Sequence, residues 1–169
     1  MKNENVLDVE SSARKDQNQN EDKEYKDEEI SHPVVHIKTP EKLKAIYISS
    51  WVAGTSSFRD SLIKIIDETE LNAVVIDIKD STGKISFHIE NEYIKNIGSA
   101  ENRIRNVNDL IDILHSKNIY VIGRISVFQD PYLAKLKPEW AIKKISDGKV
   151  WQDRKGLSFL DPTNENVHK

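Results

Sequence analysis

The sequence predicts a mixed α/β fold built on a parallel sheet, and three observations support this prediction. Residues 71–80 read Leu-Asn-Ala-Val-Val-Ile-Asp-Ile-Lys-Asp, and the first half of this segment has the apolar, β-branched composition of a strand buried on both faces. An earlier strand, a helix and this strand fit within about forty residues, as in a βαβ unit. A further apolar run at residues 119–128 predicts a third buried strand.

The first β/α unit is expected at residues 44–69. Residues 44–49 read as a strand, and residues 50–55 read as a loop. Ser57 fits the N-cap of a helix that ends near Thr69. One face of this helix carries apolar side chains at helical spacing, namely Phe58, Leu62, Ile65 and Ile66.

The connection at residues 81–106 is longer than most βα connections, and such loops usually shape a binding cleft. It contains a Thr-Gly turn and a short strand expected at residues 84–89. A helix with its own apolar stripe follows, formed by Val107, Leu110, Ile111 and Leu114. After the third strand, a short helix is expected at residues 132–136, and a last helix start near residues 161–165.

Charge separates the N-terminal segment from the rest of the chain. Residues 1–39 hold six Lys/Arg against ten Asp/Glu and few apolar residues, so we expect a disordered leader or linker. Residues 40–169 hold nineteen Lys/Arg against eighteen Asp/Glu, and this near-neutral body argues against nucleic acid as a partner.

The absence of cysteine excludes disulfides and thiolate metal sites. No apolar run approaches the roughly 20 residues of a membrane span, and the N-terminus lacks a signal-peptide pattern.

Charged residues gather where the predicted strands end. Asp77 and Lys79 lie two apart on one strand and leave the same face, whereas Asp80 leaves the other. Arg124, near the end of the next strand, can join Asp77 and Lys79. Carboxyl ends of parallel strands carry the active site in barrel and doubly wound folds. A buried structural ion-pair network that touches no substrate is the equal alternative.

Four further residues can be interpreted in two ways. Asp130 either lines the cleft or caps the helix that starts at Pro131. Trp51 follows the first strand and either stacks on a sugar ring or packs in the core. Trp140 and Trp151 fit packing better than a sugar platform. The histidines show no ligand spacing, and no phosphate loop, serine-hydrolase elbow or zinc-protease motif is present.

Four blocks of the sequence resemble the glycoside-hydrolase domain family of bacterial cell-envelope proteins. The blocks are residues 44–47, 69–80, 123–130 and 160–164, in the order in which the family has them. The resemblance implies a (β/α)₈ TIM-like barrel. The family continues into a strand with a further Asp and an Arg that this sequence lacks. Residues 40–169 therefore look like the first three β/α units of a barrel domain, truncated at its C-terminal side.

The resemblance also implies a function, the hydrolysis of O-glycosyl bonds in a polysaccharide by carboxylate acid/base catalysis without cofactor or metal. Such catalysis needs two carboxyl groups, about 5–5.5 Å apart for retention or about 6.5–9.5 Å for inversion. The candidate catalytic residues are Asp77 and Asp130. The candidate substrate-binding residues are Trp51, Lys79, Asp80 and Arg124. The alternatives are a non-catalytic carbohydrate-binding barrel of the cell envelope and an inactive fragment.

The resemblance favours an extracytoplasmic or cell-envelope location, whereas a true start at Met1 indicates the cytoplasm. A three-stranded sheet would leave an unpaired edge, and apolar residues such as Val75 and Ile122 would lack partners on the barrel-interior side. We therefore expect the isolated chain to be inactive, marginally stable and prone to associate through that edge.

Overall fold

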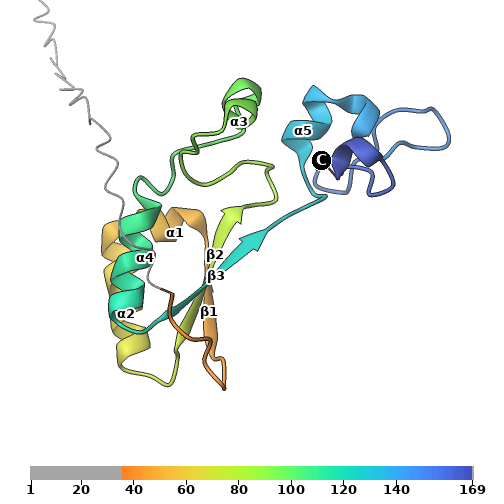
Figure 1. Cartoon of the computed structure of the whole chain (residues 1–169). Helices are drawn as coiled ribbons and strands as arrows, with labels where there is room; N and C mark the ends of the chain where they lie inside the picture. Colours follow the sequence, from red (N-terminus) through yellow and green to blue (C-terminus); the bar gives the residue numbers. More distant parts are fainter. Residues whose placement is uncertain (1–35, 169) are drawn as a thin grey trace, which may run out of the picture. The chain divides into compact units, whose positions relative to one another are not determined.

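The fold centres on a sheet of three parallel strands, which confirms the predicted α/β class (Figure 1). The computed structural model describes residues 36–168, so the disorder expected for residues 1–39 falls almost entirely outside the described residues. The strands are β1 (Ala45–Ile48), β2 (Ala73–Lys79) and β3 (Tyr120–Ile125), in the order β1-β2-β3. The three carboxyl ends therefore meet at one edge of the sheet.

Helices connect the strands and continue beyond β3. The two longest, α2 and α4, are the helices predicted from their apolar stripes. A helical turn precedes α2, and short helices occur in the connection after β2 and beyond β3. The helices are α1 (Ser50–Gly54), α2 (Ser56–Asp67), α3 (Glu92–Ile97), α4 (Val107–Ser116) and α5 (Pro131–Leu136), with 3₁₀ turns η1 (Pro138–Trp140) and η2 (Glu165–Val167).

Two local expectations were wrong. Residues 50–55 were expected as a loop but contain α1, whose five residues are too few to show an apolar stripe. Residues 84–89 were expected as a strand, yet only Ile85 pairs, in isolated bridges with Lys79 and Ala100. The same connection contains α3, which the sequence did not predict because none of its residues is buried.

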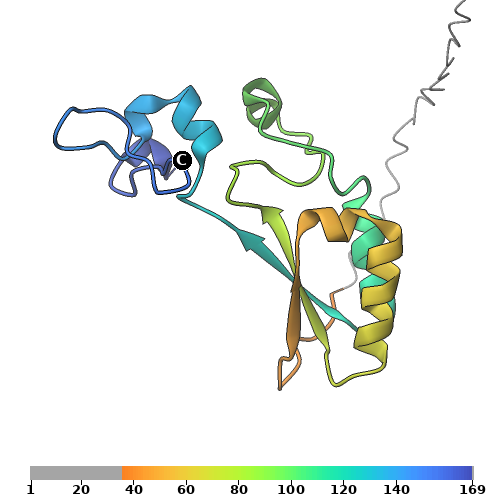
Figure 2. The same cartoon turned by 180° about the vertical axis from the view of Figure 1, so that it is seen from behind.

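The main core lies between one face of the sheet and the helices α2 and α4, which lie on the same side of the sheet in both views (Figures 1 and 2). Side chains alternate along a strand, and Val74 and Ile76 of β2 point into this core. The core is completed by apolar residues from both helices and from the long connection, including Leu62, Ile63, Ile66, Ile104, Leu110 and Leu114.

The opposite face of the sheet carries the other half of each strand. Val75 and Asp77 alternate with the core residues of β2, and the strand register places Tyr47 and Ile122 on either side of Val75. Tyr47 is 52% exposed. No helix of the described residues covers this bare face (Figures 1 and 2).

A second, smaller core forms beyond β3. Ala134, Ala141 and Leu160 are buried there, and Trp140 packs against them. Single β-bridges join its extended segments, including the pair Lys143 and Val150, which flank a turn at residues 145–147. Among residues 36–168, every helix is too short or too polar to span a bilayer.

Candidate functional site

Asp77 lies on the bare face near the carboxyl end of β2 and is held by two side chains from the neighbouring strands. Its Oδ1 accepts a hydrogen bond from Arg124 Nη1 at 2.5 Å, and its Oδ2 accepts one from the Tyr47 hydroxyl at 2.5 Å. The register of the sheet pairs Asp77 directly with Arg124. Asp77 is buried, whereas the Arg124 side chain is 46% exposed. The predicted meeting of Asp77 and Arg124 on one face is therefore observed.

The Asp77 carboxylate raises the pKa values of both of its side-chain partners. The hydrogen bond to Asp77 raises the pKa of the Tyr47 phenol, with burial and the nearby carboxylate adding to the effect. The same carboxylate raises the pKa of the Arg124 guanidinium. Tyr47 therefore remains a neutral donor and Arg124 a cation over the whole neutral pH range. Arg124 also lies over the Tyr47 ring, 5.6 Å from its centroid.

Lys79 was expected to join Asp77 and Arg124, but the structure pairs it elsewhere. The register shifts between Asp77 and Lys79, so strict alternation along β2 is lost at its end. Lys79 Nζ lies 2.9 Å from Asp130 Oδ2 and donates to the backbone carbonyl of Ser126 at 2.7 Å. The three charged residues were expected to share one layer, but they form two ion pairs, Asp77 with Arg124 and Lys79 with Asp130.

Asp130 takes the capping position that the sequence offered as one of two interpretations. Its Oδ1 accepts a hydrogen bond from the backbone N–H of Leu133 at 2.7 Å and so caps α5. With Oδ2 paired to Lys79, both oxygens are engaged, and the side chain is buried. A catalytic role for Asp130 stays a prediction.

Asp80 belongs to a third cluster, built around Arg103 from the long connection. Arg103 forms an ion pair with Asp80, contacts Glu101 at 2.6 Å and donates to Ser50 Oγ at 3.2 Å. Burial raises the pKa of Asp80, but hydrogen bonds from Thr82 and Arg103 outweigh burial and hold the pKa below its usual value. Asp80 is therefore a stable carboxylate held by both Thr82 and Arg103.

Trp51 lies on α1, beside this cluster. The Arg103 guanidinium stacks over the Trp51 ring, 5.0 Å from its centroid. The residue is 60% exposed, so the alternative that it packs in the core was wrong. Sugar stacking by Trp51 stays a prediction.

The two other tryptophans pack against apolar neighbours. Trp140 packs in the second core, as expected, and Trp151 lies against Phe159 with ring centroids 5.6 Å apart. No group of three or more His, Asp or Glu side chains capable of holding a metal occurs between residues 36 and 168.

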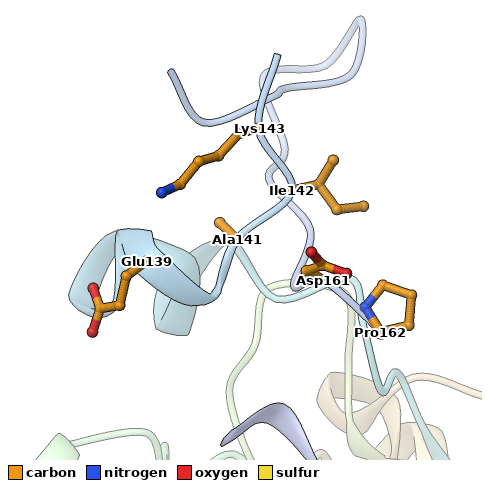
Figure 3. A pocket seen from close by; sticks show the side chains of 6 residues that line it. All are labelled: Glu139, Ala141, Ile142, Lys143, Asp161 and Pro162. Atoms are coloured by element: carbon orange, nitrogen blue, oxygen red, sulfur yellow. The ribbon is translucent and has the colours of Figure 1, made fainter. Parts of the chain in front are cut away.

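Two shallow hollows lie away from Asp77. One, of about 520 Å³, is shown in Figure 3, lined by Glu139, Ala141, Ile142, Lys143, Asp161 and Pro162. The other, of about 500 Å³, lies at the starts of α2 and α4. Asp77, Lys79, Asp80 and Trp51 line neither hollow, so the candidate site rests on the charged clusters at the strand ends.

Among the residues that sequence reasoning missed are Tyr47, which binds Asp77, and Arg103, which binds Asp80. Tyr47 could have been found, because strand alternation places it on the same face as Val75 and Asp77. Arg103 carried no comparable signal, because it lies in an irregular connection without periodicity.

Residues 45–169 match the model of a family described as "Putative glycosyl hydrolase domain". The chain is also similar to the crystal structure of a hypothetical protein from Ruminiclostridium thermocellum ATCC 27405, with 34% sequence identity and a TM-score of 0.67. The match covers 72% of this chain and 63% of that chain, so this chain spans less than two thirds of its structural relative. No curated protein matches.

Proposed function

The chain belongs to the family whose model it matches over residues 45–169, and from that premise we propose that it hydrolyses O-glycosyl bonds in a polysaccharide as part of a (β/α)₈ barrel. We place the start of the barrel portion near residue 40, after the leader or linker expected at residues 1–39. The proposal of a barrel wall is supported by three parallel strands with helices on one face and a bare opposite face. A whole barrel needs about 250 residues, and the similar solved chain is longer than this one.

The observation that carries the proposal is the placement of Asp77. It is a buried carboxylate at the carboxyl end of a parallel strand, on the face that a barrel would turn inward. Tyr47 and Arg124 fix both of its oxygens by side-chain hydrogen bonds. In the proposed reaction Asp77 acts as the ionised carboxylate, either attacking the anomeric carbon or activating the water that does so.

We assign the second carboxyl group of the reaction to Asp130. Asp130 would have to leave the α5 cap and Lys79 before it could protonate a glycosidic oxygen. Lys79 then contributes mainly by holding Asp130. Arg124 is the more accessible cation and can donate to a sugar hydroxyl beside Asp77.

The test uses the protein expressed from its complete open reading frame. We expect release of reducing ends from a neutral polysaccharide, and we expect Asp77→Asn to lower the rate about 10²-fold or more while circular dichroism and the unfolding midpoint are kept. An unchanged rate in Asp77→Asn would leave this residue with a structural role and overturn the assignment.

A second function is favoured by the exposed ring of Trp51. A non-catalytic barrel would bind carbohydrate through such an aromatic without needing two carboxyl groups at catalytic spacing. Saturable binding of an oligosaccharide with no turnover, and no effect of Asp77→Asn on that binding, would establish this function instead.

A further inference from the structure

We propose that Trp51 is a fixed stacking platform for a neutral pyranose ring and that Arg103 is the positioning residue that holds it; this inference rests on the proposed function. The platform consists of Trp51, Arg103, Asp80, Glu101 and Ser50. It lies where β1 and β2 reach their carboxyl ends, the edge of the sheet at which barrel enzymes bind their substrates.

The helical turn α1 turns the indole outward. Ser50 and Ala53 lie on one side of the turn and are buried, and Val52 packs against the core. Trp51 is about 160° around the helix from Ala53 at 100° per residue. Because Ala53 faces the core, Trp51 therefore faces away from it. Thr55 Oγ1 donates to the Trp51 carbonyl at 2.8 Å and fixes the end of the turn.

Arg103 covers one face of the indole and is itself immobilised. Only 4% of its side chain is exposed, and its guanidinium donates to Asp80, Glu101 and Ser50. Backbone contacts add to this, because a Cβ at Gly54 would meet the Arg103 carbonyl oxygen at 1.9 Å. With one face covered and 60% of the residue still exposed, the other face is open to a ligand.

The chemistry of the platform selects the ligand class. An aromatic face held rigidly attracts the C–H face of a pyranose at little cost in side-chain entropy. The surrounding charges are one guanidinium and two carboxylates, Asp80 and Glu101, and Glu101 is 45% exposed. A partly exposed carboxylate accepts hydrogen bonds from sugar hydroxyls and repels an acidic sugar. The platform therefore fits a neutral glycan and disfavours a uronate.

The first experiment measures binding by calorimetry in the full-length Asp77→Asn protein, so that turnover does not interfere. The probes are cellohexaose, chitohexaose and maltohexaose, with hexagalacturonate as the acidic counterpart. We expect Trp51→Ala to weaken binding of a neutral probe about threefold to tenfold. The matched control is Trp151→Ala, which removes an indole packed on Phe159, and it should leave the affinity unchanged. Unchanged affinity in Trp51→Ala, tighter binding of hexagalacturonate, or no binding of any probe would overturn the proposal.

The second experiment tests Arg103 by a double-mutant cycle. Arg103→Lys keeps the charge beside Asp80 but loses the planar stack, so we expect affinity to fall about threefold in the parent and not at all in Trp51→Ala. An equal loss in both backgrounds would assign Arg103 a merely structural role. Turnover that depends on Asp77 with no Trp51 effect would overturn the platform alone; Trp51-dependent binding without turnover would overturn the proposed hydrolysis alone.

Discussion

Two ion pairs at the end of β2 have similar components and different surroundings. In both, the carboxylate is buried and each of its oxygens accepts one hydrogen bond. The partners of Asp77 are two partly exposed side chains, Tyr47 and Arg124. The partners of Asp130 are a backbone N–H and Lys79, whose side chain is only 18% exposed. Asp77 can thus be reached by rotation of side chains, whereas freeing Asp130 requires a helix end to open.

This difference distinguishes a carboxylate whose partners are mobile side chains from one that also caps a helix. Another hydroxyl donor can replace Tyr47 or Arg124 at Asp77 without backbone movement. Replacement of the Leu133 N–H at Asp130 leaves the first turn of α5 without its cap. Three substitutions test the comparison, in order of decreasing effect on the free energy of unfolding in the full-length protein.

Asp130→Ala should have the largest effect. It removes the α5 cap and leaves Lys79 without its carboxylate in a largely buried position, and we expect a loss of about 3 kcal/mol or more. Asp77→Ala is the matched change and should cost only about 1 kcal/mol, because Arg124 is 46% exposed and remains hydrated. Urea unfolding followed by circular dichroism measures both. Equal losses would erase the distinction between the two pairs.

Gly83→Ala should have the next largest effect. Gly83 has a φ of +84°, and a Cβ there would meet Asp130 Oδ1 at 2.0 Å. Strain and displacement of the Asp130 carboxylate together should cost about 2 kcal/mol or more. Gly156→Ala is the control, with a φ of +77° and nothing within 4 Å of the added Cβ, and it should cost about 1 kcal/mol. The same urea measurement on both variants separates strain from collision, and equal losses would show that Asp130 tolerates displacement.

Tyr47→Phe should have the smallest effect, below about 1 kcal/mol, because the lost hydrogen bond to Asp77 is partly exposed. The pKa of Tyr47 is raised in the folded protein, so its contribution is complete below pH ~10 and disappears as the pH rises through the folded-state pKa. Unfolding of the parent and the variant is compared at neutral and alkaline pH, with Tyr93→Phe on α3 as the control. A difference between parent and variant that grows with pH would contradict the assignment.

The sheet was predictable because buried parallel strands have a composition of their own. The apolar runs in residues 71–80 and 119–128 became β2 and β3, and the apolar stripes became α2 and α4. The short helices α1 and α3 were missed because one is about a single turn long and the other buries nothing.

The site was predictable only as far as strand geometry reaches. Asp77 and Arg124 meet because parallel register pairs them. Lys79 does not join Asp77 and Arg124 because the strand register shifts just before Lys79, and no local sequence pattern indicates this shift. Arg103 comes from a connection whose path depends on tertiary contacts, so its meeting with Asp80 and Trp51 could not be derived from spacing.

The close approach of Gly54 to the Arg103 carbonyl has a consequence for protein engineering. Gly54 is exposed, and surface codons are usually the first to be randomised in a library. Any side chain at this codon would collide with the backbone carbonyl of Arg103, and a shift of that backbone would displace the Arg103 side chain. A library that tests the proposed stacking platform should therefore vary Trp51 and Glu101 and keep codon 54 fixed, since exposure there does not imply mutational tolerance.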